Sequence, residues 1–242
     1  MITVLGVGHV FDISTQVRKI IEDERPDAVC VELDPLRYQA LINPPRDNPD
    51  VPLAYNLLAS FQRRLARSYG GEVGAEMLAA IKAAGAVGSE VMLIDVNATQ
   101  MFRRLWQEMP SLEKVKLGLS AISSLFLSRR RVEKELENFQ EHEELYLEEM
   151  AQQFPTLKRM LIDDRNHIMA QRIDAAASAF PNVLAVVGDG HVEGIVRLLG
   201  RDDITIIRLR ELLGQGSMPV DDRDGNAQAC FHYEYSLRDE AF

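Results

Sequence analysis

Residues 2–13 read Ile-Thr-Val-Leu-Gly-Val-Gly-His-Val-Phe-Asp-Ile, an apolar run that passes through two glycines to a histidine. A short run of apolar and β-branched residues predicts a buried strand. Val17, Ile20 and Ile21 then recur at helical spacing. The N-terminal segment is therefore predicted to be a strand that leads through a tight turn into a helix.

The same order of strand and helix recurs along the chain. Apolar runs at 28–33, 91–95, 183–187 and 204–207 are expected to be strands, and helical periodicity follows the first three of them. Alternating strands and helices predict a parallel sheet with helices packed on its faces. The expected fold class is therefore α/β, with a central, mainly parallel sheet.

Between about 111 and 179 the alternation pauses and only helical periodicity is visible, which we interpret as a long helical insertion. Near the C-terminus, apolar and polar residues alternate over about 229–237, a pattern typical of an edge strand. A chain of 242 residues is still commonly one α/β domain. We therefore expect a single domain over residues 1–242.

The composition, with 46% hydrophobic and 26% charged residues, is that of a globular protein. The net charge of -10 argues against nucleic-acid binding, because phosphate contacts require an excess of Lys and Arg. Two cysteines do not form a disulfide framework, and no signal peptide or membrane-spanning segment is visible. We expect a cytoplasmic protein, or the soluble domain of a membrane-anchored one.

The pattern G-x-G-H-V-x-x-I occurs twice, at 6–13 and at 188–195. Each copy follows an apolar strand and precedes a helix, so each is expected to deliver its histidine, His9 or His191, at the carboxyl edge of the sheet. A single junction of this kind is a common structural turn, whereas two copies with histidine at the same offset favour a functional site. Glycines there leave the backbone open to a ligand. The expected substrate-binding backbone positions are Gly6, Gly8, Gly188 and Gly190.

Two carboxylates close otherwise apolar strands. Glu32 and Asp95 each stand where a buried, ionised carboxylate is costly unless a metal or another cation compensates it. Glu32 has the alternative of emerging into solvent or accepting backbone hydrogen bonds from the following helix. Asp95, two residues before Asn97, has the alternative of capping a helix. Asp34, which precedes a proline, is assigned to helix capping.

Arg165 is expected to face the interior, because it shares a helical stripe with Leu161 and Ile168. An inward arginine needs an anionic partner, and Glu32, Asp95 or a substrate carboxylate can serve. The alternative is a structural ion pair between helices.

Taken together, the paired G-x-x-H motifs, the segment Val-Glu32-Leu-Asp-x-x-Arg37 and the pair Arg165-Asn166 resemble the TraB/PrgY pheromone-shutdown family, from Thr3 to about Leu213. That family is related to the TIKI metalloproteases and, more distantly, to the erythromycin esterases. The resemblance implies an α/β fold with an inserted helical layer. The residues that it implicates are His9, Glu32, Arg37, Asp95, Arg165, Asn166 and His191.

The sequence departs from the family pattern at two positions. Asp164 stands where the family usually has Glu before Arg-Asn, and Val96 follows Asp95 where Arg is typical. Many relatives also carry C-terminal membrane segments, and none is visible here. The chain is therefore expected to be a soluble member or the soluble part of a longer protein.

The working hypothesis is a metal-dependent hydrolase that acts on a peptide or protein substrate. His9, Glu32 and His191 would bind one divalent ion, with Zn²⁺, Mn²⁺, Co²⁺ and Fe²⁺ all suited to such ligands. Arg165 or Arg37 would stabilise the oxyanion, and Asp95 would act outside the ligand set or accept a proton.

Two alternatives stay open at this point. One is a metal-independent, esterase-like hydrolase in which a histidine acts as general base and Glu32 assists it. The other is a non-catalytic module that binds peptides or signals through its helices and final strand. The alternating final strand and the charged helices also lead us to expect a homodimer.

Overall fold

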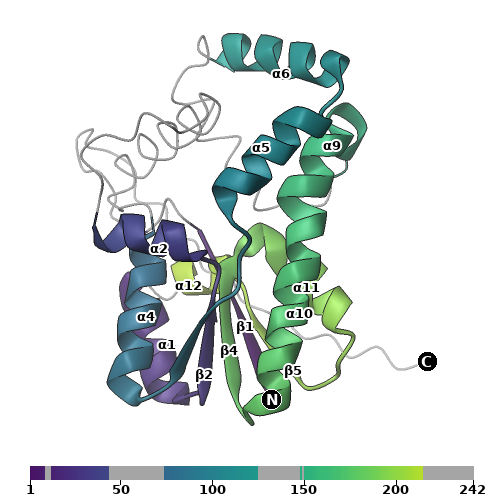
Figure 1. Cartoon of the computed structure of the whole chain (residues 1–242). Helices are drawn as coiled ribbons and strands as arrows, with labels where there is room; N and C mark the ends of the chain where they lie inside the picture. Colours follow the sequence, from purple (N-terminus) through teal and green to yellow (C-terminus); the bar gives the residue numbers. More distant parts are fainter. Residues whose placement is uncertain (9–11, 44–73, 125–147, 149, 215–242) are drawn as a thin grey trace, which may run out of the picture.

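The computed structural model of the chain describes residues 1–8, 12–43, 74–124, 148 and 150–214 (Figure 1). Within these ranges, five strands form one sheet in the order β3-β2-β4-β1-β5, and each of the four strand pairings is parallel. The strands are β1 Ile2–Val7, β2 Ala28–Val31, β3 Glu90–Leu93, β4 Val183–Gly188 and β5 Ile204–Ile207. The predicted α/β class and the five apolar strand runs are confirmed.

Helices join the strands and cover the sheet. The described helices are α1 Ser14–Glu24, α2 Pro35–Ile42, α4 Ala75–Val87, α5 Ala98–Glu108, α6 Ser111–Ser124, α9 Pro155–Lys158, α10 Asp164–Ala179, α11 Asp189–Leu199 and α12 Leu209–Gly214. A π-helical turn, η1 Arg159–Asp163, connects α9 to α10. As expected, Asp34 caps α2: its side chain accepts hydrogen bonds from the Leu36 and Arg37 amides, and Pro35 opens the helix.

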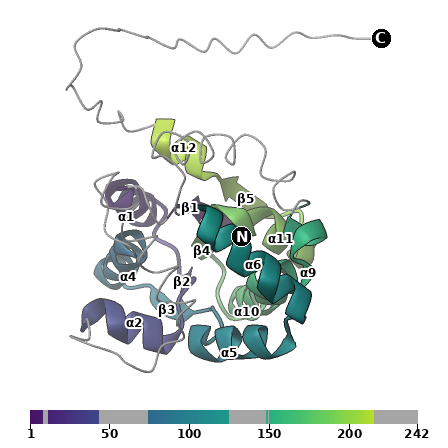
Figure 2. The same cartoon turned by 90° about the horizontal axis from the view of Figure 1, so that it is seen from above.

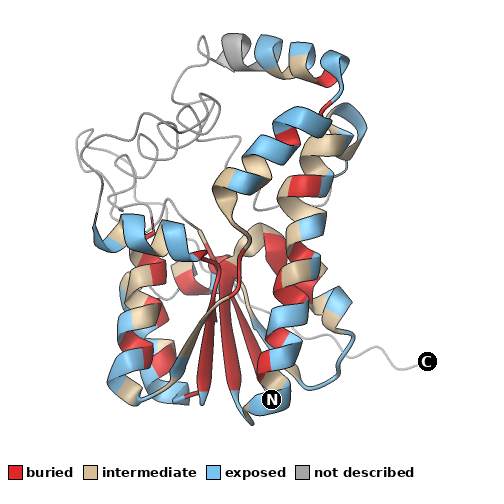
Figure 3. Ribbon diagram, viewed as in Figure 1, coloured by how far each residue is buried: buried red, intermediate tan, exposed pale blue. Residues whose placement is uncertain are grey.

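The two faces of the sheet bury different side chains, because successive residues of a strand point to opposite sides. Leu5, Val29 and Leu184 face a core shared with α1 and α4. Val4, Cys30 and Ala185 face a core shared with α10 and α11. Figures 1 and 2 show these helix pairs on opposite faces, and Figure 3 shows the central strands as the buried centre. Burial raises the pKa of the Cys30 thiol to about 12.

A third apolar cluster lies beyond the carboxyl edge of the sheet, where Leu105 and Met109 meet Met160. It joins α5 to the helical run α9–α10, which Figure 1 shows extending past the strands. The described parts of the expected insertion at 111–179 are helical except at Phe154, which precedes α9. Residues 125–147 of that insertion and the expected edge strand at 229–237 lie outside the described residues.

The sheet has a switch point between β1 and β4. These strands are neighbours, with Val7 in register with Gly188, yet β1 leads to α1 on one face and β4 to α11 on the other. In open α/β sheets, ligands bind outside the carboxyl ends of strands at such a point. The two G-x-G-H motifs therefore both begin at the place where the fold favours a binding site.

In the described part of the chain, no helix combines the length and the apolar character needed to cross a bilayer.

Candidate functional site

Glu32 is the buried centre of a polar cluster at the carboxyl edge of the sheet. It follows β2 directly and is 2% exposed. Its Oε2 accepts a hydrogen bond of 2.5 Å from the Gly188 amide at the end of β4, and its Oε1 pairs with Nη2 of Arg165. The carboxylate therefore does not emerge into solvent, and neighbouring strand and helix ends hold both of its oxygens.

Asp95 is the second buried carboxylate and shares Arg165 with Glu32. Arg165 donates from Nε to Asp95 Oδ1 at 3.0 Å and from Nη2 to Asp95 Oδ2 at 2.9 Å. Asn97, and not Asp95, caps α5 by accepting from the Gln100 amide. The helix-cap alternative for Asp95 is therefore wrong.

Arg165 faces the interior, as predicted, and its anionic partners are Glu32 and Asp95. Burial alone would lower the pKa of Arg165, but the charges of the two carboxylates and the hydrogen bonds to them together raise it. Nη1 of Arg165 also donates to the Leu161 carbonyl at 3.1 Å, inside the π-helical turn η1. Wide turns of this kind are common at functional sites.

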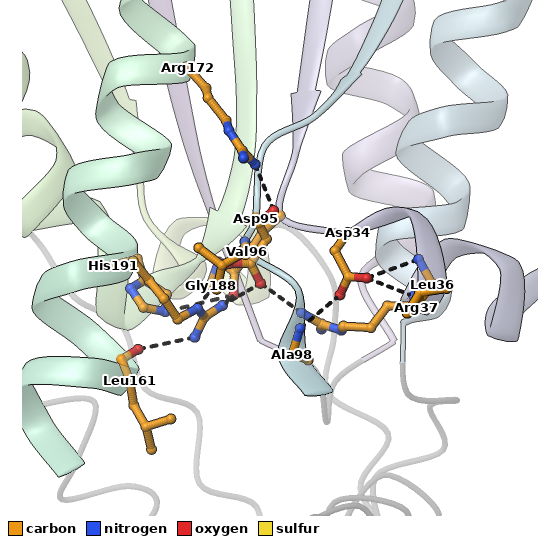
Figure 4. Close-up of polar contacts among 12 residues, drawn as sticks. Asp34, Leu36, Arg37, Asp95, Val96, Ala98, Leu161, Arg172, Gly188 and His191 are labelled. Atoms are coloured by element: carbon orange, nitrogen blue, oxygen red, sulfur yellow. Dashed lines mark hydrogen bonds and ion pairs between the residues drawn. The ribbon is translucent and has the colours of Figure 1, made fainter. Parts of the chain in front are cut away.

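Arg37 joins the cluster from its outer side. It stands in the first turn of α2 and donates from Nη1 to Asp95 Oδ2 at 2.9 Å, with its side chain 29% exposed. Figure 4 shows Arg37 and Asp95 side by side beneath the strand ends. Two carboxylates and two guanidinium groups thus alternate from Arg37 at the surface to the buried Glu32.

His191 lies next to Glu32 in the first turn of α11 and is 6% exposed. Its Nε2 is 3.7 Å from Glu32 Oε1, and its Nδ1 is 2.6 Å from Oδ1 of Asn166. Because an amide oxygen only accepts hydrogen bonds, Nδ1 is the donor in this pair. In the neutral ring, Nε2 then carries the lone pair. Asn166 therefore selects the tautomer of His191.

The close approach of Asn166 depends on Gly194. A Cβ atom added to Gly194 would lie 2.2 Å from Nδ2 of Asn166, so α10 and α11 meet here through a residue without a side chain. The resemblance implicated Asn166, and the structure places it against His191. His167, which we did not assign to the site, is exposed on the same helix.

The remaining predicted site residues are placed as follows. His9 lies outside the described residues, so the three-ligand set stays a prediction. Among the described residues, no group of three or more His, Cys, Asp or Glu side chains is arranged to hold a metal ion. Gly188 contributes its amide to Glu32, and Gly6 is buried beneath the side chain of Asp189. A backbone contact of these glycines with substrate stays a prediction, as it does for Gly8 and Gly190.

Sequence reasoning missed three polar residues around the cluster. Arg172 of α10 donates from Nη1 to the Asp95 carbonyl at 2.7 Å, as Figure 4 shows. Asp189, inside the second motif, forms a two-pronged pair with Arg208, which follows β5. A signal for this pair was present, since Asp189 stands in a strand-end motif, but identifying Arg208 requires the order of the strands.

Two comparisons with known proteins bear on this site. The sequence pattern that defines the TraB/PrgY/gumN family matches residues 1–208. An uncharacterized protein of Methanocaldococcus jannaschii is 30% identical over 224 residues, which cover 86% of this chain and 56% of that protein. This chain thus spans little more than half the length of that relative. The family match includes His9, the carboxylate cluster and the second motif.

Proposed function

This chain belongs to the TraB/PrgY/gumN family, and on that premise we propose that it is a metal-dependent hydrolase of amide bonds in peptides or proteins. The observation that carries the proposal is the buried pair of Glu32 and His191 at the switch point of the sheet. Arg165 and the Gly188 amide compensate the charge of Glu32, so its burial alone does not require a ligand. What supports the proposal is that the carboxylate lies beside an imidazole with a fixed tautomer, at the place in the sheet where ligands bind.

The donor atoms of this pair fit a transition metal ion. Imidazole nitrogen and carboxylate oxygen bind such ions at about 2.0–2.2 Å, which places two ligands of one ion roughly 3–4 Å apart. The separation of 3.7 Å between His191 Nε2 and Glu32 Oε1 lies in that range. Asn166 supplies the outer hydrogen bond that metal-binding histidines usually make through their other nitrogen.

Glu32 and His191 would hold the ion, with His9 as the proposed third ligand. A bound ion of this kind lowers the pKa of a coordinated water and polarises a carbonyl group. Mn²⁺, Co²⁺ and Zn²⁺ all suit these ligands. The chain's own contribution is to fix the orientation of both side chains, through Arg165 and the Gly188 amide for Glu32 and through Asn166 for His191.

Of the two arginines, Arg37 is the better candidate to contact substrate. Arg165 is bound by Asp95, Glu32 and the Leu161 carbonyl, so its guanidinium is held in place. Arg37 is partly exposed and contacts Asp95 through Nη1. Arg37 would therefore stabilise the negative charge that develops on the carbonyl oxygen as water attacks, and Asp95 would keep both guanidinium groups in position. The proton lost by the water is assigned to a carboxylate oxygen of Glu32.

The test compares wild-type protein, purified without a chelating tag, with Glu32→Gln, His191→Ala and the matched control His167→Ala. We expect bound transition metal and peptide hydrolysis to be lost in the first two variants and kept in the control, because His167 is exposed on α10. Metal content is measured by elemental analysis, and hydrolysis with a peptide library supplemented with Mn²⁺, Co²⁺ or Zn²⁺. Equal metal content in all four proteins would contradict the proposed ligands.

A smaller change tests the outer hydrogen bond. Asn166→Ala removes the acceptor from His191 Nδ1 and is expected to lower metal affinity or kcat/KM about 10–100-fold. Titration calorimetry with Mn²⁺ and steady-state kinetics measure the two effects. Unchanged values for both would show that Asn166 does not orient His191.

One observation favours a second candidate, the metal-independent hydrolase. Arg165 already compensates the charge of Glu32, so the described cluster is electrically balanced without an ion. In that case the Nε2 of His191 would take the proton from water, with Glu32 beside it. Hydrolysis that survives chelation and is lost in His191→Ala would select this candidate. A biological effect that survives both His9→Ala and His191→Ala would instead select a non-catalytic binding module.

A further inference from the structure

Asp189 lies between the two glycines of the second G-x-G-H motif and is the first residue of α11. Its carboxylate does not cap its own helix. Instead, Oδ1 accepts from Nε of Arg208 at 3.0 Å and from the Leu209 amide at 2.9 Å, while Oδ2 accepts from Nη2 of Arg208 at 2.9 Å. Asp189 therefore ties the start of α11 to the end of β5 and the start of α12.

The bond between Asp189 and Arg208 crosses the end of β1, although neither residue belongs to that strand. In the sheet, β1 lies between β4 and β5, so the Asp189 carboxylate reaches across the end of β1. There it lies against Gly6, where an added Cβ would be 2.1 Å from Asp189 Oδ1. Gly6 is not among the described residues with positive φ, so its backbone conformation does not require glycine. Glycine is needed at this position because the side chain of Asp189 occupies the space that a Cβ atom would take.

The first turns of α11 are thus held from two sides. On one side Asp189 binds Arg208 across Gly6, and on the other side Asn166 fits against Gly194 and binds the imidazole of His191. His191 stands between these two attachments, two residues after Asp189 and three before Gly194. Because both attachments fix the position of the first turn of α11, they also fix the orientation of the His191 ring relative to Glu32.

We propose that Asp189 is a positioning residue for His191, acting through its two-pronged bond to Arg208 across Gly6. The functional meaning of this inference rests on the proposed role of His191. Its structural content, that the pair orients the ring, can be measured without any hydrolysis.

A pair with no connection to His191 would give a different result, and the chain contains a more exposed pair of the same residue types. Arg201 binds Asp203 through Nε at 2.8 Å and Nη2 at 2.9 Å, at the opposite end of β5. The two pairs share residue types and two-pronged geometry, and they flank the same strand. The pair at the far end of β5 therefore controls for losing an Arg–Asp bond as such.

The experiment follows the His191 side chain by NMR in the 242-residue chain labelled with ¹⁵N-histidine. His191→Gln assigns its signals among the five histidines. We expect Asp189→Asn and Gly6→Ala to shift the Nδ1 signal and speed exchange of its proton with water, while Asp203→Asn leaves both unchanged. Where hydrolysis is measurable, Asp189→Asn should lower kcat by no more than about 10-fold with KM unchanged, because Asn166, the direct partner of His191, is still in place and losing such a partner costs about 10–100-fold.

An unchanged Nδ1 signal in folded Asp189→Asn would overturn the proposal, whatever the protein's activity. A shifted signal in a protein that binds no metal and hydrolyses no peptide would support the positioning role and reject the proposed function, so the two failures are distinguishable. If Asp189→Asn does not fold, Arg208→Lys replaces it, because that variant keeps the charge and loses the two-pronged geometry. Its expected shift is smaller and in the same signal, and no shift overturns the proposal.

Discussion

The two edges of the sheet use the same chemical pair in different surroundings. At the carboxyl edge, Asp95 is 3% exposed and binds Arg165 through both of its oxygens. At the amino edge, Asp203 binds Arg201 in the same two-pronged way, but 47% of its side chain is exposed. Exposed ion pairs contribute little to stability, whereas breaking a buried pair leaves a charge that water cannot solvate. Burial, and not pairing alone, therefore decides how much stability is lost when each pair is broken.

The pKa values of the arginines at the two edges rise for different reasons. At the carboxyl edge, burial works against the charge of Arg165, and the charges of Glu32 and Asp95 together with their hydrogen bonds reverse that effect. At the amino edge, the hydrogen bond to Asp203 raises the pKa of Arg201, and the reciprocal bond lowers the pKa of Asp203 to about 2. The carboxylates thus keep the buried Arg165 charged, whereas Arg201 and Asp203 form their pair in contact with solvent.

The largest effect is expected from Arg165→Met. The substitution leaves Glu32 and Asp95 buried without the cation that they share, so the free energy of unfolding should fall by about 3–5 kcal/mol. Urea denaturation at pH 7 measures the change. The matched substitution at the amino edge, Arg201→Met, should leave the denaturation midpoint within experimental scatter. Equal effects of the two substitutions would remove the contrast between the edges.

The second effect concerns two helical glycines. Gly194→Ala should destabilise the protein by roughly 1–3 kcal/mol, because Asn166 must move away from the new methyl group. Gly85→Ala in α4 meets nothing within 4 Å and should stabilise the protein by about 0.5–1 kcal/mol. Thermal unfolding shows whether each variant is more or less stable than the wild type. A loss of stability in Gly85→Ala would contradict the expected difference between the two glycines.

The smallest effect is the acid dependence of the amino-edge pair. Because the folded pKa of Asp203 is about 2 and its ordinary value is 3.8, the pair's contribution is fully present above pH 4 and disappears as the pH falls toward 2. Asp203→Asn should therefore flatten the fall in unfolding midpoint between pH 4 and 2 slightly and leave the midpoint at pH 7 nearly unchanged. A steeper fall in the variant would have the wrong sign.

The fold was largely predictable because its central strands, β1, β2 and β4, are buried on both sides. Such strands appear in the sequence as continuous apolar runs, and β1 and β4 were located within a residue. The edge strand β5 is only partly buried, but its run Ile-Thr-Ile-Ile is rich in β-branched residues and was located as well. The order of strands was not predictable, since no local pattern states which strands are neighbours. The placement of Arg208 beside Asp189 depends on that order, with β1 between their strands. The pair was therefore invisible until the sheet was known.

The buried part of the candidate site was predictable for a related reason. Glu32, Asp95 and Arg165 stand among apolar residues, where a charge requires compensation, and the structure brings them together. The glycines were harder to interpret. The sequence suggested open backbone for a ligand, whereas Gly6 gives room to the side chain of Asp189. A sequence cannot distinguish glycine that admits a ligand from glycine that admits a neighbouring residue.

The π-helical turn η1 has a consequence for helix phase. One extra residue in a turn rotates everything after it by about 100° relative to a regular helix. Leu157 before the turn and Met160 within it pack with residues of α5, and Asn166 and Ile173 face α11 and the sheet after it. Deleting one residue from η1 would therefore turn Arg165 and Asn166 away from the carboxylates and His191 together. The one extra residue in η1 therefore sets how α10 is oriented relative to the helices on either side of the turn.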